Sequence, residues 1–252
     1  MTQYHLYILT GASRGMGLAM AEQLLSADHV LLCLSRQGSE TLAGRAELLG
    51  MTLEQWSMDL EHSTAAAIRL EAWLRNYPQA TVASATLINN ACVIPRIVPL
   101  SAADPADLAH ALRVGLEAPL LLTGAFLRAT EAWNIPRKVL NISSGLGRRA
   151  MASQAGYCAT KAGLDHFTRC LALDEAIKPH GAKVCSLAPG VIDTDMQVQL
   201  RSADAAAFPS RQSFVDLKDS GQLKSPADAA HRVLAYLARP DFGSNPIGDV
   251  RD

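Results

Sequence analysis

The chain has 252 residues, of which 49% are hydrophobic and 19% are charged, and its formal net charge at pH 7 is −1. This length suffices to bury the core of one α/β domain, so we expect a single domain over residues 1–252. The near-neutral charge gives no electrostatic reason to expect a nucleic acid or an acidic membrane surface as partner. A small or neutral ligand fits this composition better.

No apolar run approaches the roughly 20 residues that cross a bilayer. The first residues, MTQYHLYILTGASRG, lack the basic stretch, apolar core and cleavage site of a signal peptide. We therefore expect a cytoplasmic protein without a membrane partner. The five cysteines are scattered and have no C-x-x-C spacing, which predicts reduced, mostly buried thiols and neither a disulfide framework nor a metal site.

Short β-rich segments alternate with helix-length segments along the whole chain. The segments that we expect to form strands are residues 4–10, 29–35, 52–59, 84–90, 138–144 and 182–189. This alternation indicates βαβ crossovers, so the predicted fold class is α/β: a single Rossmann-type, doubly wound parallel sheet with helices on both faces. Residues 196–226 lack a simple pattern, and we expect short helices and loops over the sheet there.

The first predicted strand leads into a glycine-rich loop, TGASRGMG, which opens a helix. Gly11, Gly15 and Gly17 let the backbone turn sharply and approach a diphosphate closely. The free N–H groups and the dipole at the start of the helix complement the negative charge of that diphosphate. The loop therefore predicts a dinucleotide site, and a structural turn without a ligand is the alternative.

The second predicted strand ends in CLSRQ and has no carboxylate there. Dinucleotide folds that prefer NAD usually present an acidic residue to the ribose 2′-hydroxyl at this point. Ser35 and Arg36 instead offer a hydroxyl and a cation, and Arg14 in the glycine loop is a second candidate cation. Guanidinium groups suit a 2′-phosphate, so the expected cofactor is NADP(H).

Tyr157 and Lys161 lie four residues apart in AGYCATKAGL, on one face of a predicted helix. The preceding strand ends at Ser144, which brings its hydroxyl to the same edge of the sheet. A tyrosine pKa is near 10, so a nearby ammonium and an oxidised nicotinamide would help by favouring the phenolate. We expect Tyr157 to be the general acid–base and Ser144 to hold the substrate carbonyl. The alternatives are surface packing of Lys161 across the Tyr157 ring and a local backbone role for Ser144, which fits Ser143 better.

Several short motifs follow one another in order: TGASRGMG, Asp59-Leu60, NNAC, NISS, YCATK and PGVIDTD. In this order and spacing the sequence resembles the short-chain dehydrogenase/reductase family over nearly its whole length. The resemblance implies that Ser144, Tyr157 and Lys161 are the catalytic set and that Lys161 also binds the nicotinamide ribose. With the residues already named, the expected cofactor-binding set is Gly11, Ser13, Arg14, Gly15, Met16, Gly17, Ser35, Arg36, Asp59, Leu60, Asn90, Ala91, Tyr157, Lys161, Pro189, Gly190, Ile192 and Thr194.

Two residues depart from the pattern of that family. Cys92 stands where members usually have glycine, which adds a side chain beside the cofactor. Gly115 stands where members usually have an asparagine that helps arrange a water chain between the lysine and solvent. We expect the space left at Gly115 to admit another water and the proton relay to survive.

The expected function is an NADPH-dependent reductase of a small-molecule ketone or diketone, with Tyr157 as proton donor. One alternative is a catalytically weak NADP-binding interaction or sensor protein, which Gly115 favours. Another is a 3-oxoacyl-carrier-protein type of ketoreductase, which needs a basic docking surface near the site.

The C-terminal residues 213–252 are similar to the ends of the sepiapterin reductase and benzil reductase subgroup. In that comparison Asp249 lies where the substrate is held, although an acidic residue near a C-terminus is more often solvated. By the family resemblance we also expect a homodimer or homotetramer. The predicted helices at 107–133 and around Tyr157 carry apolar residues on more than one face, and one face suits a partner subunit.

Overall fold

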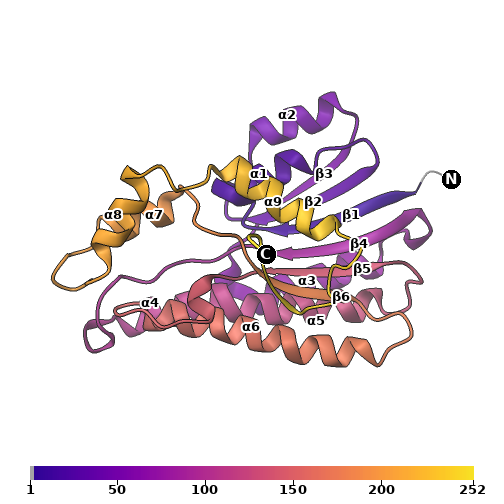
Figure 1. Ribbon diagram of the computed structural model, residues 1–252. Coiled ribbons are helices and arrows are strands. Elements are labelled where there is room, and N and C mark those ends of the chain that lie inside the picture. Colours follow the sequence, from indigo (N-terminus) through magenta and orange to yellow (C-terminus); the bar gives the residue numbers. More distant parts are fainter. Residues whose placement is uncertain (1–2) are drawn as a thin grey trace.

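The computed structural model describes residues 3–252, and within them seven parallel strands form one sheet (Figure 1). The strand order is β3-β2-β1-β4-β5-β6-β7. The strands are β1 (Tyr4–Thr10), β2 (His29–Ser35), β3 (Thr52–Ser57), β4 (Val82–Asn89), β5 (Arg137–Ile142), β6 (Lys183–Ala188) and β7 (Ile247–Asp249). The order reverses between β1 and β4, which places a ligand crevice at their carboxyl ends. The predicted doubly wound parallel sheet is confirmed.

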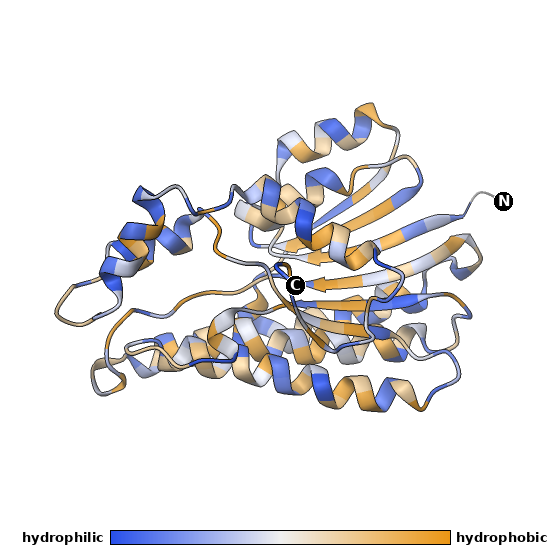
Figure 2. Ribbon diagram, in the orientation of Figure 1, coloured by the Kyte–Doolittle hydropathy of each residue, from blue (hydrophilic) through white to orange (hydrophobic). Residues whose placement is uncertain are grey.

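Helices cover both faces of the sheet (Figure 1). One face carries α1 (Gly15–Gln23), α2 (Glu40–Leu48) and α9 (Pro226–Ala238). The other carries α3 (Ser63–Arg75), α4 (Pro105–Leu112), α5 (Ala118–Thr130) and α6 (Ala155–Ala176). Successive strand residues point to opposite faces, so Leu6 and Ile8 enter one core and Leu9 enters the other. Figure 2 shows hydrophobic residues along the strands and mixed hydropathy on the helices.

The predicted strands match the observed ones closely. The bounds of β1 and β2 are as predicted, and those of β3 to β6 lie within two residues at each end. The edge strand β7 was missed. The irregular segment does contain two short helices, α7 (Asp195–Arg201) and α8 (Arg211–Asp219). They project beyond the carboxyl edge of the sheet and do not lie over it, which corrects the prediction (Figure 1).

All five cysteines are free, but only Cys33 and Cys185 are buried. Cys92 and Cys158 are partly exposed and Cys170 is exposed, so the expectation of mostly buried thiols is wrong for three of the five. Within residues 3–252, no helix combines the length and apolar character needed to cross a membrane.

The helix between α4 and α5 widens into a π-helical turn at Arg113–Glu117, with Gly115 at its centre. A Cβ built on Gly115 would lie 2.5 Å from the Thr160 Cγ2 and 3.3 Å from the Cys92 Sγ. These two side chains occupy the space that a side chain at residue 115 would need. The prediction that this space admits another water is therefore wrong.

We predict that Gly115→Asn lowers the free energy of unfolding by about 1–3 kcal/mol, because overpacking a filled core has this cost. Thr160 cannot rotate away freely, since its Oγ1 donates a hydrogen bond to the Gly156 carbonyl at 2.8 Å. Thermal unfolding should show a Tm lowered by roughly 2–10 °C for a chain of this size.

The double variant Gly115→Asn/Thr160→Ser is the matched test of this cause. Serine keeps the hydroxyl but lacks the methyl group that would meet the new side chain, so part of the lost Tm should return. Thr160→Ser alone serves as the control. A Gly115→Asn protein as stable as the wild type would contradict the packing argument.

Candidate active site

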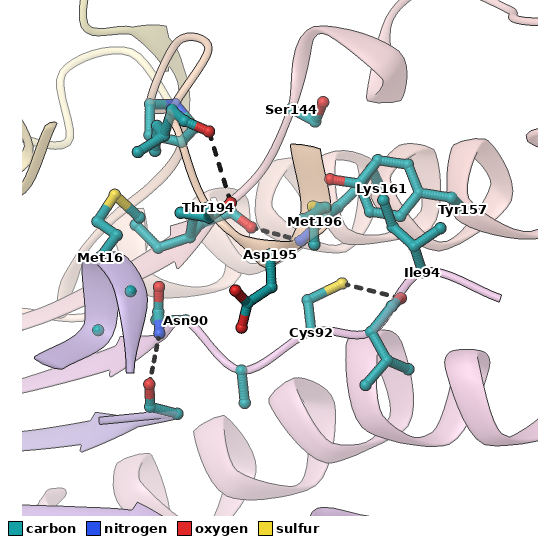
Figure 3. Close-up of a pocket in the computed structure, with 18 of the residues that line it drawn as sticks. Met16, Asn90, Cys92, Ile94, Ser144, Tyr157, Lys161, Thr194, Asp195 and Met196 are labelled. Atoms are coloured by element: carbon teal, nitrogen blue, oxygen red, sulfur yellow. Dashed lines mark hydrogen bonds between the residues drawn. The ribbon is translucent and has the colours of Figure 1, made fainter. Parts of the chain in front are cut away.

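A cavity of about 590 Å³ lies at the carboxyl edge of the sheet. Every residue predicted to bind cofactor lines it, and so does Ser144. Figure 3 shows Asn90, Cys92, Ser144, Tyr157 and Lys161 gathered around this space. Residues far apart in the sequence therefore meet at one site, although their individual roles stay predictions.

The glycine loop is bound tightly to the end of β4. Gly11 has a φ of +71°, and a Cβ on it would lie 2.9 Å from the Ala91 Cα, so only glycine fits. The Asn90 Nδ2 donates to the carbonyls of Thr10 and Gly11 at 3.0 and 3.2 Å. The Thr10 Oγ1 accepts from the backbone N–H groups of Asn90 and Ala91. Asn90 thus holds the loop in place.

The start of α1 is suited to an anion. No side chain caps this helix at Arg14, so its first N–H groups have no side-chain acceptor there. These groups lie where the backbone of the glycine loop opens into the cavity. The loop and the helix end together fit the diphosphate of a dinucleotide.

The end of β2 presents a cation without a carboxylate. Arg36 is exposed, and within residues 3–252 its guanidinium makes no ion pair. The Ser35 Oγ donates to the Gln37 carbonyl at 2.7 Å. The second predicted cation is different, because the Arg14 Nη1 pairs with the Asp195 Oδ2 at 2.5 Å. Arg36 is therefore the cation available to a phosphate at this end.

The tyrosine and lysine of α6 are both buried, with 7% and 3% of their surface exposed. The Lys161 Nζ donates to the Ile142 carbonyl at 2.8 Å and lies 5.7 Å from the centre of the Tyr157 ring. Ser144 follows β5, and its Oγ accepts from the Leu146 N–H at 3.2 Å. Burial of both α6 side chains in the cavity wall contradicts the alternative of packing at a helix surface.

Burial shifts the pKa values of Tyr157 and Lys161. It raises the pKa of the Tyr157 phenol above its ordinary value, and Lys161 and Ser144 oppose this only in part. For Lys161, burial disfavours the charge, but Cys92, Tyr157 and Asp165 favour it, and the balance raises its pKa. Lys161 thus favours the phenolate as expected, but burial outweighs it, and the pKa of Tyr157 lies above its ordinary value.

A buried carboxylate fixes α6 against the sheet. The Asp165 Oδ1 accepts from the hydroxyls of Ser143 and Ser186 at 2.5 and 2.7 Å. Its Oδ2 pairs with the Arg148 Nε at 3.2 Å. Asp165 is 1% exposed, so this network is inside the protein. The Ser143 hydroxyl thus bonds to a buried side chain and not to local backbone groups, so the expectation that the local backbone role fits Ser143 better is wrong. The Ser144 Oγ is the one that accepts from a nearby backbone N–H, and both serines line the cavity.

The remaining wall of the cavity is largely apolar. Its apolar residues include Ile94, Leu146, Met151, Met196, Leu200 and Phe214. Sequence reasoning missed these, and it missed the polar lining residues Gln154, Gln197 and Arg251. The helices α7 and α8 supply several of them, and only the tertiary structure brings these helices to the site.

Asp249 is the one predicted site residue that does not line the cavity. Its carboxylate accepts from the Arg251 Nε and Nη2 at 2.7 and 2.6 Å. Arg251 lowers the pKa of Asp249 through these hydrogen bonds. The structure thus gives Asp249 an arginine partner and places Arg251 at the cavity.

Comparison with known proteins agrees with this geometry. The family model described as short chain dehydrogenase matches residues 5–205. The chain is 33% identical over 243 residues to a benzil reductase ((S)-benzoin forming) of Bacillus cereus, covering 96% of each chain. It is 32% identical over 258 residues to the sepiapterin reductase of Meriones unguiculatus, covering 97% of this chain and 95% of that one.

A solved structure has the same fold. The metagenomic short-chain oxidoreductase in complex with NADP is 27% identical and superimposes with a TM-score of 0.70, covering 98% of this chain and 95% of the other. The match to the family model spans most of the chain, and relatives above 30% identity align over nearly all of it. This protein therefore belongs to the short-chain dehydrogenase/reductase family of oxidoreductases.

Proposed function

We propose that this protein is an NADPH-dependent carbonyl reductase that acts on ketones or diketones, with Tyr157 as the proton donor. One observation carries the proposal: the hydroxyl of Ser144, the phenol of Tyr157 and the ammonium of Lys161 share one cavity with the glycine loop. A binding module has no need for such a trio beside a dinucleotide site.

The cavity fits the cofactor that the family uses. A Cβ would block the close approach at Gly11, and the uncapped start of α1 offers N–H groups to a diphosphate. Bound NADPH would supply the hydride that reduces the carbonyl carbon. Lys161 would hold the nicotinamide ribose, and Asn90 keeps the loop that receives the diphosphate in position.

The protein's own groups then handle the substrate oxygen. The Ser144 hydroxyl binds the carbonyl oxygen and stabilises the negative charge that develops there. Tyr157 gives its proton to that oxygen, and its raised pKa keeps the proton available at neutral pH. The Lys161 ammonium then stabilises the phenolate that remains, because a positive charge beside it lowers the cost of ionisation.

The preference for NADPH is supported by the charges around the end of β2. Arg36 has no ion-pair partner within the described residues, and no carboxylate stands at the end of that strand to bind a 2′-hydroxyl. The metagenomic relative holds NADP in the corresponding fold. The charge of Arg14 is partly balanced by Asp195, which makes Arg14 the weaker candidate for a phosphate.

The apolar lining and the relatives support carbonyl substrates with bulky apolar groups. The relatives that align over nearly the whole chain are named for benzil and sepiapterin. The sensor alternative rested on Gly115, but that glycine is matched to the volumes of Thr160 and Cys92. The lack of an asparagine at position 115 therefore gives little support to the alternative of a catalytically weak sensor protein.

We also propose that the protein is a cytoplasmic homodimer or homotetramer. Apolar side chains are exposed on the outer helices, including Leu120 on α5 and Leu173 on α6 at 38% and 73%. Five free thiols suit a reducing compartment. Light scattering at micromolar concentration tests the assembly, and a monomer would contradict it.

We expect Arg36→Ala to weaken NADPH binding by about tenfold or more, since a charge-assisted contact to phosphate contributes roughly 1.5–3 kcal/mol. NADH binding should hardly change, because NADH lacks the 2′-phosphate. Fluorescence titration with both cofactors measures this, and Arg14→Ala should have a smaller effect. Equal losses for NADPH and NADH would remove Arg36 from the phosphate site.

Tyr157→Phe should abolish turnover and leave NADPH binding largely intact, because the change removes one hydroxyl and little volume. NADPH oxidation in the presence of benzil measures turnover, and a fluorescence titration measures binding. Tyr77→Phe, which alters a tyrosine packed against Trp73, is the matched control and should be fully active. Substantial turnover by Tyr157→Phe would show that another group donates the proton.

The alkaline titration of Tyr157 gives a test of its environment. Because burial raises its pKa, the phenolate should form only above the ordinary value of about 10. Ultraviolet difference titration of the wild type against Tyr157→Phe isolates this tyrosine. Lys161→Met removes the ammonium that favours the phenolate, so the midpoint should move to still higher pH. A midpoint that falls in Lys161→Met would refute the assigned role of Lys161.

A further inference from the structure

Two glutamines line the cavity with buried amides that lack partners. Gln154 is 2% exposed and Gln197 is 6% exposed, and both line the cavity. Among the described residues, neither the Nε2 nor the Oε1 of Gln154 has a hydrogen-bond partner, and the Oε1 of Gln197 has none. Buried side-chain amides are nearly always paired in folded proteins. The missing partner is therefore to be sought in the ligand that occupies this cavity.

Gln154 is well placed to act beside the proton donor. It immediately precedes α6, three residues before Tyr157. Gln154 is the N-cap residue of this helix, and both it and Tyr157 line the same cavity. The Gln154 carbonyl accepts from the Cys158 N–H at 2.8 Å, and its N–H donates to the Met151 carbonyl at 3.3 Å. The backbone that carries this amide is therefore fixed.

The residue before Gln154 is held in an unfavourable conformation. Ser153 has a φ of +62°. Within residues 3–252 it is the only non-glycine residue with a positive φ. Left-handed backbone of this kind is disfavoured for L-residues and tends to persist at functional sites. The Ser153 Oγ donates to the Ala207 carbonyl at 2.5 Å, which ties the start of α6 to the segment between α7 and α8. This contact sets the direction in which the chain enters Gln154.

Gln197 approaches the cavity from a different element. It lies on α7, where its N–H donates to the Thr194 carbonyl at 2.9 Å. Leu200 on the same helix and Phe214 on α8 line the same cavity and are buried. An amide among apolar side chains favours a neutral polar group over a charged one, because a buried charge needs a compensating charge.

We propose that Gln154, together with Gln197, recognises a second, neutral carbonyl or amide group of the substrate, next to the carbonyl that is reduced at Tyr157. This rests on the proposed carbonyl reductase function and names its substrate class as α-dicarbonyl compounds: 1,2-diketones and α-keto amides. Gln154 and Tyr157 line one cavity and lie three residues apart in the chain, so the proposal places the two polar groups of the substrate close together. The glutamines are substrate-recognition residues and take no part in proton transfer.

A matched pair of substrates tests this inference. Benzil and deoxybenzoin share one carbon skeleton and differ in that a CH₂ group replaces the second carbonyl. Gln154→Met keeps the length of the side chain and removes its hydrogen bonds. The kcat/KM for benzil should fall by about tenfold, and that for deoxybenzoin should change by less than about twofold. For each substrate, the kcat/KM of the variant is divided by that of the wild type. The greater intrinsic reactivity of benzil cancels in this ratio.

Two further variants and two further readouts separate recognition from a structural role. Gln197→Met should show the same selective loss. Gln222→Met alters an exposed glutamine on the turn after α8 and should leave both substrates unaffected. The Tm and the NADPH affinity of Gln154→Met should not fall, because the amide bonds to no protein group. A lowered Tm with equal losses for both substrates would show that Gln154 is structural and would overturn the inference.

The outcomes also separate this inference from the proposed function. If the wild type reduces both compounds and Gln154→Met affects them equally, the recognition role is wrong and the carbonyl reductase proposal stands. If the wild type oxidises NADPH with neither compound, both proposals fail. A selective loss for benzil in Gln154→Met, with unchanged deoxybenzoin reduction and Tm, supports both.

Discussion

The placement of the reactive groups depends on one buried carboxylate, Asp165. It accepts hydrogen bonds from Ser143 after β5 and from Ser186 on β6, and it pairs with Arg148. Arg148 in turn donates to the Gly248 carbonyl on β7 at 2.7 Å. A buried charge must be fully paired to be tolerated. These contacts therefore hold α6 in one position relative to the ends of β5, β6 and β7. Because Ser143 precedes Ser144, the same network fixes the serine hydroxyl relative to the tyrosine on α6.

A second constraint is volume, and it links the two departures from the family pattern. Gly115 leaves room for the Thr160 methyl group and the Cys92 thiol, which would both meet a side chain at that position. Cys92 therefore adds a side chain in the region where Gly115 removes one. The π-helical turn is present although the asparagine is absent, so the turn does not depend on that asparagine here. A protein interior has little spare space, so the residues at positions 92 and 115 have to be considered together.

The sequence was most informative where local pattern and parallel topology agree. Strands β1 and β2 are clear β-rich runs bounded by turns, and the carboxyl ends of parallel strands must share an edge, so the glycine loop, Arg36 and Ser144 converge. Strand β7 has three residues and exists through its pairing with β6, which leaves too little pattern to detect. The burial of Gln154 arises from tertiary packing, and a glutamine before a helix is ordinarily exposed. The ion pair of Asp249 with Arg251 likewise depends on side-chain direction, which spacing does not determine.

Burial and charge around Tyr157 and Lys161 fit the reducing direction that we propose for the reaction. In the structure the pKa values of both Tyr157 and Lys161 are raised, so the phenol is neutral and the lysine is charged at neutral pH. A protonated phenol beside a cation is the state that a reductase needs before the carbonyl oxygen gains charge. After the proposed proton transfer, the phenolate and the ammonium would form a buried pair, which costs far less than either charge alone. In the proposed mechanism, the same burial that raises the pKa of Tyr157 thus makes the ammonium of Lys161 necessary once the proton has left.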